Sequence, residues 1–523
     1  MIETILVLGF CILLGALLTR LTKIPAPLTL IFVGLVLSLL PGIGHIVSEA
    51  QIEPEVVLSV MLPFLLYWEA LNISLRGIRQ MLRGVLVSGT VMVIAVAMAE
   101  GFIGSWLGLS VGVAFLVGAA VAPTDATAVA AFGKGISPNV LLALRAESLI
   151  NDGTALVIFA VACNYAAGNT DISPLHIGGN FLISFIGAAL VGIAVGYVVS
   201  RLGRFVQDPM IGNVCRILVP FIAYFLAEEI GASGVLATVV VGLVIGQTSA
   251  HFVTTGSRVT GRHFWIVSCY ILNAVLFVIV GIQLPEVIET LSSDTLSHAL
   301  MAVVVLYVVM MIARYLVAEF SYQIMRRSMR NVTNLPERIL YAAAGFRGAI
   351  SLAVALSIPH EIPGRDLVVF ITAGIVILSL IIQGIAVPYA IKLTQRHPNP
   401  HNEANRLKNE AEVRNALTSN YKLVLQELSR LNAEAGGDEE LEQRLRSEFE
   451  RGLADYSRGE TGVYENRYYR EEERRLRLAI IAMGREHLTE LRDRGELDDE
   501  AYNELVDIFD LAELNISGPI SAE

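Results

Sequence analysis

The sequence predicts an all-α polytopic membrane protein, and its composition and apolar runs lead to that fold class. Hydrophobic residues make up 54% of the 523 residues. Charged residues make up 17%, whereas a soluble protein carries about 25%. The mean hydropathy is +0.61, and long apolar runs follow one another as far as residue 395. This composition excludes a collagen, a disulfide-stapled secreted domain and a disordered chain.

Thirteen apolar runs are long enough to cross a bilayer, whose hydrocarbon core takes about 20 helical residues. The first begins at Ile2 without a basic region or a cleavage site, so we expect an uncleaved span. The four cysteines share no metal-type spacing and are expected to be small buried hydrophobes. The runs lie near residues 4–20, 24–42, 56–71, 84–106, 109–132, 139–163, 177–200, 212–230, 233–250, 265–284, 298–323, 337–359 and 367–391.

The charges of the loops predict the orientation, because cytoplasmic loops are rich in Lys and Arg. If the N-terminus lies outside, the cytoplasmic loops hold 14 Lys or Arg residues and the outer loops hold only Arg365. The outer loops carry acidic residues instead, such as Glu55, Glu286 and Glu289. We therefore expect a multi-pass protein of the plasma (inner) membrane with an outer N-terminus and a cytoplasmic C-terminus.

The chain changes character near Pro398, which predicts a membrane domain over 1–395 and a cytoplasmic acidic helical domain over 396–523. The second part carries 18 Lys/Arg and 29 Asp/Glu, so it holds the whole net charge of −11. This acidity argues against nucleic acid and anionic lipid as its partners. It contains no phosphate loop or dinucleotide fingerprint. A regulatory or dimerising domain and a solvated appendage without a regulatory effect both remain open.

A polar stripe interrupts the sixth apolar run, where residues 147–152 read Glu-Ser-Leu-Ile-Asn-Asp. Positions four apart share a helix face, so Glu147 stacks on Asn151. Ser148 stacks on Asp152 in the same way. An ionisable group near the bilayer centre costs at least about 3 kcal/mol, and hard oxygen ligands suit an alkali cation. Interhelical hydrogen bonding would explain Ser148 and Asn151, but the two carboxylates indicate a functional site.

Two other runs contain predicted helix breaks. In the fifth run, Pro123 removes a backbone donor, and the adjacent Asp125 favours an ion site over a simple proline kink. In the twelfth run, Arg347 lies between two glycines, which also indicates an unwound segment. The two runs are seven apart, so they are candidates for counterparts in an inverted repeat.

The remaining charges inside the runs need partners or an interface. Arg314 lies mid-run, and an unpaired buried guanidinium is costly, so we predict that it pairs with Glu147. That pair would leave Asp152 as the titratable cation ligand. Glu100 is expected to extend its carboxylate to the outer interface, and Glu319 is expected to be structural.

Five motifs, taken together and in this order along residues 1–395, resemble the sodium/proton antiporters of the NhaP/NHE branch. Their counterparts in that family are an LPPIIF segment followed by an acid and AG, a TDP break, the ESLxND signature, IAR and GLRGA. Here Ala126 stands in place of the final proline of the break. The motifs are LPFLLYWEA (62–70), PTDA (123–126), RAESLIND (145–152), IAR (312–314) and GFRGA (345–349).

The resemblance implies a cation site around Asp152, which would alternate between Na⁺ and a proton. Ser148 and the backbone of Thr124 would add oxygen ligands for the cation. Glu69 would reach the site through water, and Asn151 would support Asp152.

The resemblance also implies supporting charges and a fold. Glu147 would pair with Arg314, and Asp125 and Arg347 would balance the helix ends at the two breaks. The family fold is the NhaA-like antiporter fold, with 13 transmembrane helices, inverted repeats and crossed broken helices. It is a homodimer, and the Asn-Asp form of the signature is associated with electroneutral one-for-one exchange.

We therefore expect a secondary active transporter, not an enzyme, that exchanges Na⁺ or Li⁺ for H⁺ by alternating access. It would need no cofactor, and its partners would be the cation, membrane lipid and a second copy of the chain. A K⁺/H⁺ antiporter on the same fold remains open, because cavities for Na⁺ and K⁺ differ only slightly in geometry. A cation channel and a membrane sensor are less favoured. An intramembrane enzyme is also disfavoured, because the sequence contains no HExxH motif and no paired aspartates in a protease-like context.

Overall fold

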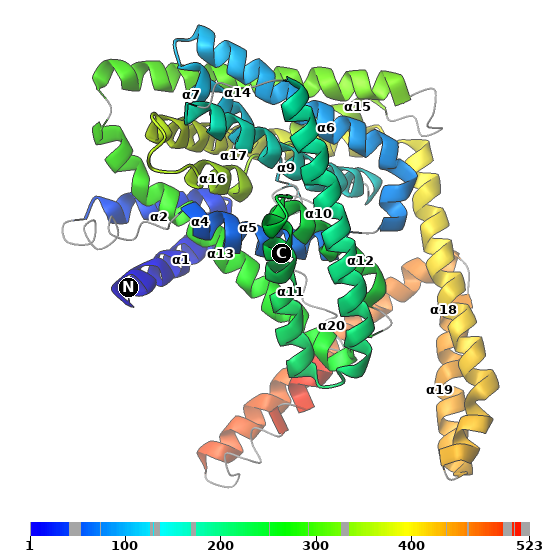
Figure 1. The fold of residues 1–523 in the computed structure, drawn as a ribbon. Helices are drawn as coiled ribbons and strands as arrows, with labels where there is room; N and C mark the ends of the chain where they lie inside the picture. Colours follow the sequence, from blue (N-terminus) through cyan, green and yellow to red (C-terminus); the bar gives the residue numbers. More distant parts are fainter. Residues whose placement is uncertain are drawn as a thin grey trace. The chain divides into compact units, whose positions relative to one another are not determined.

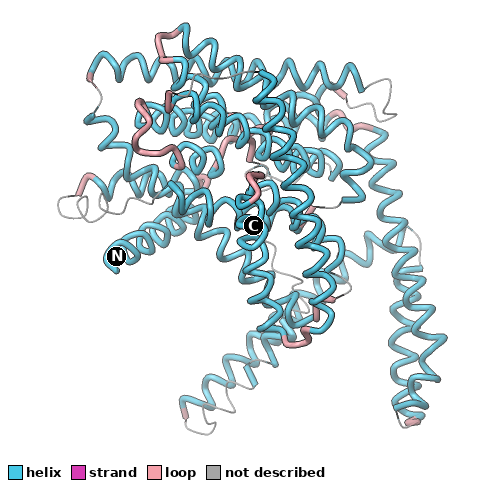
Figure 2. Tube along the Cα trace, in the orientation of Figure 1, coloured by secondary structure: helices cyan, strands magenta, loops and turns pink. Residues whose placement is uncertain are grey.

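All regular structure in the described part of the protein is helical (Figure 1, Figure 2). The chain divides into two compact units, Met1–Asn399 and Pro400–Glu523. The structure is a computed structural model, and it describes residues 2–40, 54–73, 75–125, 129, 136, 138–168, 174–249, 252–290, 292–325, 334–435, 437–457, 460–494, 505–506 and 508–513.

The first unit holds the apolar helices, and each of the thirteen predicted runs overlaps at least one of its elements. The long helices are α1 (Ile2–Thr22), α6 (Leu75–Trp106), α9 (Pro138–Ala166), α10 (Pro174–Leu202), α11 (Pro209–Glu229), α13 (Thr255–Thr290), α14 (Ser293–Met325) and α17 (Arg365–Arg396). The shorter ones are α2 (Ala26–Ser38), α4 (Pro54–Val56), the π-helix η1 (Val57–Met61), α5 (Leu62–Leu71), α7 (Val111–Val121), α12 (Gly234–Thr248), α15 (Leu335–Ala343) and α16 (Ala349–Leu356), and a 3₁₀ turn, η2 (Gly203–Phe205), follows α10.

Nine helical stretches of the described residues are long and apolar enough to cross a membrane. Three shorter apolar helices, α2, α7 and α12, accompany them. The fifth predicted run differs from a simple span, because its helix ends at Val121 and the chain is non-helical over 122–125. The rest of that run, apart from Val129, lies outside the described residues.

Helices α2 and α13 pack closely because each has a glycine where they cross. A Cβ atom at Gly34 would overlap the carbonyl oxygen of Val278, and one at Gly281 would overlap that of Ile31. Small residues let helices pack backbone to backbone, which is the usual way to join helices in lipid. Glycine at both positions therefore fixes this crossing.

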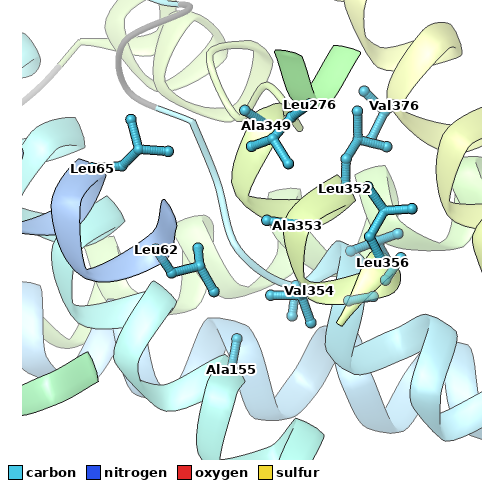
Figure 3. Packing of buried hydrophobic residues seen from close by; sticks show 14 of the residues in the cluster. Leu62, Leu65, Ala155, Leu276, Ala349, Leu352, Ala353, Val354, Leu356 and Val376 are labelled. Atoms are coloured by element: carbon cyan, nitrogen blue, oxygen red, sulfur yellow. The ribbon is translucent and has the colours of Figure 1, made fainter. Parts of the chain in front are cut away.

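The centre of the first unit is packed with aliphatic side chains. Figure 3 shows apolar residues of α5, α9, α13 and α17 gathered around α16. Leu352, Val354 and Leu356 of α16 are each at most 4% exposed. The short helix that follows the second break is therefore held in place by packing on several sides.

The second unit contains the helices α18 (Pro400–Ala435), α19 (Glu439–Ser457) and α20 (Glu460–Asp493). The chain reverses between α18 and α19 at Gly437, whose φ of 75° suits glycine. Tyr421 and Phe449 pack their rings 5.9 Å apart across this hairpin. Hydrogen bonds from Ser429 and Arg446 lower the pKa of the Glu442 carboxyl below its ordinary value.

Candidate functional site

Two helix breaks meet inside the first unit. After α7 the backbone is non-helical over residues 122–125, and between α15 and α16 it is non-helical over 344–348. The backbone N–H of Asp125 donates to the carbonyl oxygen of Phe346 at 2.8 Å. Gly348 has no room for a side chain, because a Cβ atom there would overlap the Asp125 carboxylate. The two interrupted segments are thus in direct backbone contact.

Arg347 joins the second break to the end of α7. Its side chain is completely buried, and Nη1 donates to the carbonyl oxygens of Ala122 and Pro123, both at 2.7 Å. Its backbone N–H donates to Ser379 Oγ of α17 at 2.9 Å. The last carbonyls of a helix carry partial negative charge, so a guanidinium is a suitable partner for them.

The polar stripe of α9 lies against the first break. Ser148 Oγ donates to the backbone oxygen of Thr124 at 2.7 Å. The amide of Asn151 bonds Thr124 twice, through Nδ2 to Oγ1 at 2.5 Å and through Oδ1 from the backbone N–H at 3.4 Å. Asn151 therefore fastens the break to α9, whereas the resemblance implied that it would support Asp152. The break has unpaired backbone groups that an amide can satisfy, which explains this choice of partner.

Asp152 is fully buried, and neither of its carboxylate oxygens has a hydrogen-bond partner among the described residues. Such a group is expensive unless it binds something. Ser148 precedes Asp152 by four positions on the same helix face, and its Oγ lies 3.4 Å from Glu69 Oε1 on α5. Ser148 thus links Thr124 of the break with Glu69.

Glu147 has the opposite environment one turn away. Arg314 Nη1 lies 3.0 Å from Glu147 Oε1, and both side chains are at most 1% exposed. Tyr341 donates its hydroxyl to the other carboxylate oxygen of Glu147. Arg314 also donates to the backbone oxygens of Ala342 and Tyr341. These are the two charges that the sequence analysis pairs, and the pair connects α9, α14 and α15.

Glu100 lies in a different environment from the one predicted, and Glu319 has a partner that the sequence did not specify. Glu100 was expected to reach the outer interface, but its side chain is 0% exposed. The expectation was wrong because a position near the end of a helix does not reveal how neighbouring helices cover it. Glu319 binds Arg338 at 2.8 Å in a partly buried ion pair.

Three side chains that hold the site were not predicted from the sequence. Tyr341 binds Glu147, and Ser379 of α17 binds Arg347 and in turn donates to Gln383 at 2.7 Å. The sequence does contain a signal for the last two, because Ser379 and Gln383 are polar residues four apart in an apolar run. Tyr341 carries no such signal, since an aromatic residue at the end of a span is common in any membrane protein.

Comparison with known proteins identifies the family. The family model described as sodium/hydrogen exchanger, transmembrane, matches residues 7–392. The chain belongs to the sodium/hydrogen exchanger family. An uncharacterized Na(+)/H(+) exchanger of Mycobacterium tuberculosis is 32% identical over 538 aligned residues, which cover 99% of this chain and 97% of that protein. The membership predicted from the five motifs is confirmed.

Two further similar proteins are named as antiporters. The Na(+)/H(+) antiporter NhaH of Halobacillus dabanensis is 30% identical, over 71% of this chain and 93% of its own length. The structure of the sodium proton antiporter MjNhaP1 from Methanocaldococcus jannaschii superposes with a TM-score of 0.60 at 20% identity, over 74% of this chain and 98% of that one. The exchanger described here is thus a multi-pass membrane transporter of a cation/proton antiport family, not an enzyme, and it shares its fold with that antiporter.

Proposed function

We propose that this exchanger moves Na⁺ against H⁺ across the plasma membrane by alternating access, with one cation exchanged for one proton. The observation that carries the proposal is the Asp152 carboxylate, which is completely buried and unpartnered within the described residues. It lies on the stripe that docks on the first helix break.

The chemistry of the donors favours an alkali cation. A carboxylate, a hydroxyl and a backbone carbonyl are hard oxygen ligands, which small hard cations prefer. Within the described ranges, no group of three or more His, Cys, Asp and Glu residues could hold a metal ion. Asp152, with oxygens of Ser148 and Thr124 and with Glu69 at the side, therefore suits a monovalent cargo.

Competition at one carboxylate couples the two fluxes. Asp152 holds either a proton or Na⁺, and in both cases its charge is neutralised. The empty carboxylate is charged, and moving it through a low-dielectric barrier is unfavourable. The loaded forms therefore cross between the two sides, while the empty form does not, so neither ion moves without the other.

The remaining residues stabilise the arrangement. Asn151 fastens the break at Thr124, and Arg347 and Asp125 balance charges at the two breaks. Because these breaks lie in the fifth and twelfth predicted spans, they fit an inverted repeat of 13 spans in which two half-helices face a common site. The homodimer, the outer N-terminus and the cytoplasmic acidic domain over 396–523 belong to the same proposal.

Reconstitution into liposomes with a trapped pH dye tests the proposal. Pulses of Na⁺ should move protons, and substitution of Asp152→Asn should abolish this movement while the melting temperature of the purified protein stays near that of the wild type. Asp366→Asn is a matched control, since it removes a half-exposed carboxylate from the start of α17. Exchange near the wild-type level in the Asp152→Asn protein would refute the assignment.

The same vesicles distinguish the neighbouring functions. Pulses of Li⁺ and K⁺ give the cation preference, and proton movement with K⁺ alone would identify a K⁺/H⁺ antiporter. An imposed membrane voltage should leave the rate unchanged if exchange is one-for-one. Cation flux without proton movement would indicate a channel and contradict antiport.

A further inference from the structure

An aromatic cluster ends directly before Glu69 in α5, and the proposed exchange does not use it. Its centre is Trp265 of α13, which is 3% exposed. Three rings of α5 pack on this indole, with ring centroids 4.1 Å away for Phe64, 5.3 Å for Tyr67 and 5.9 Å for Trp68. Positions 64, 67 and 68 share one face of a helix. This face of α5 is therefore the one that packs on α13.

The stack between Trp68 and Trp265 holds the ring that precedes Glu69. The angle between the two ring planes is 1°. Aromatic rings at this separation attract each other beyond the effect of the area that they bury. The backbone oxygen of Trp68 is held as well, because Asn72 Nδ2 donates to it at 2.7 Å. Both the ring and the carbonyl of Trp68 are therefore fixed.

Helix α12 packs against the same end of α5. A Cβ atom at Gly242 would overlap the backbone oxygen of Tyr67, and one at Gly246 would overlap that of Leu71. Helix ends fray, and α5 ends only two residues after Glu69. The close contact with α12 and the aromatic stack thus restrain a helix end that would otherwise be the least ordered part of α5.

This helix end carries the Glu69 carboxylate to the polar stripe of α9. Glu69 Oε1 lies 3.4 Å from Ser148 Oγ, and Ser148 precedes the unpartnered Asp152 by one helical turn within the described residues. A Glu side chain turns about several bonds, so the place of its carboxylate depends first on where the backbone is held. A misplacement of about 1 Å is enough to weaken a site strongly.

We propose that Trp265 is a positioning residue for Na⁺ binding, which holds Trp68, and through it Glu69, against Ser148. This inference rests on the proposed cation site at Asp152. Without the indole, the end of α5 is free to turn, and Glu69 no longer adds its negative charge beside the cation. Trp265 therefore sets the apparent affinity for Na⁺. The maximal rate depends on the loaded forms of Asp152 and stays near that of the wild type.

The test is Na⁺-driven proton movement in liposomes that contain Trp265→Leu, an apolar substitution without a ring. The Na⁺ concentration for half-maximal rate should rise roughly fivefold, as expected when a site loses one polar group. The maximal rate should not change. Trp265→Phe keeps an aromatic ring and should recover most of the affinity. Trp106→Leu is the matched control, because that ring is 82% exposed at the end of α6. An unchanged Na⁺ dependence in Trp265→Leu overturns the proposal.

A double-mutant cycle separates positioning from a general loss of packing. Glu69→Gln should also raise the half-maximal Na⁺ concentration. Adding Trp265→Leu to Glu69→Gln should raise it no further, because the indole acts through that carboxylate. Additive effects of the two substitutions would overturn the proposal, since Trp265 would then act on the site by another route.

A variant on α5 keeps the test decisive if Trp265→Leu does not fold. Trp68→Leu removes the other ring of the stack, and the folded protein should show the same rise in half-maximal Na⁺ concentration. Wild-type Na⁺ dependence in that variant overturns the proposal. Failure of the proposed function is distinct, because then the wild type would not exchange or Asp152→Asn would still do so.

Discussion

The two ends of the polar stripe on α9 hold acidic residues with opposite surroundings. Glu147 is bound by a guanidinium and a tyrosine hydroxyl, whereas Asp152 has no hydrogen-bond partner among the described residues. Both side chains are completely buried on the same helix. Residue type and burial therefore do not decide what an intramembrane carboxylate does. The fixed partners of Glu147 suit a structural group, and the unpartnered Asp152 is the carboxylate that we propose binds the ion.

The largest expected effect concerns the partner of Glu147. Arg314→Ala leaves a buried carboxylate unpaired, which should lower the stability by about 3–5 kcal/mol. Yield and melting temperature in detergent measure this loss. The double substitution Glu147→Ala with Arg314→Ala removes both charges and should recover most of the melting temperature. If the double variant melts as low as Arg314→Ala, the contrast between the two ends of the stripe is wrong.

A smaller effect is expected at the oxygen donors beside Asp152. Ser148→Ala removes the hydroxyl that links Thr124 and Glu69, which should weaken apparent Na⁺ affinity by roughly fivefold, the equivalent of about 1 kcal/mol. Ser357→Ala is the control, because that buried hydroxyl donates to the backbone oxygen of Val354, three residues earlier at the end of α16. Unchanged Na⁺ dependence in Ser148→Ala would remove this hydroxyl from the cation site.

The smallest effect concerns a carboxylate at the surface, Glu442. It extends the comparison of the two buried carboxylates to an acidic group outside the membrane core. Glu442 accepts hydrogen bonds from Ser429 at 2.6 Å and Arg446 at 3.0 Å, and they lower its pKa. A lowered pKa means that the network stabilises the α18–α19 hairpin above the ordinary carboxyl pKa. This contribution is lost as pH falls through the lowered value.

Hydrogen exchange of peptides from α18 and α19 in the whole protein measures this contribution. Protection should decrease slightly from neutral to acidic pH in the wild type. In Glu442→Gln it should already be reduced at neutral pH, with little further change. Strong loss of protection would contradict the small value expected of an exposed ion pair.

Much of the site could be predicted from local sequence because the signals are local. The stripe at 147–152 follows from helical spacing, and the breaks follow from Pro123 and from the glycines around Arg347. The partners of these groups are distant in sequence. Arg314 binds a residue 167 positions away, and Arg347 binds Ala122 across 225 positions. Helical periodicity says which face a side chain occupies, but not which helix meets that face.

Glu100 and Asn151 illustrate this limit. The position of Glu100 near the end of an apolar run suggested an interfacial carboxylate, yet neighbouring helices bury it completely. Asn151 is adjacent to Asp152 in sequence, but its amide bonds Thr124, because the interrupted backbone offers a donor and a hydroxyl at the right place.

The sequence by itself determined the solvent of each part of this protein, the faces of its helices and the positions where two helices break. These properties depend on transfer free energy and on backbone chemistry within a few neighbouring residues. Only the tertiary structure decided that neighbouring helices bury Glu100, that Tyr341 joins Arg314 in binding Glu147, and that Asn151 bonds Thr124. These outcomes depend on contacts between helices that are far apart in the chain, and the sequence of one helix does not specify which neighbour covers it.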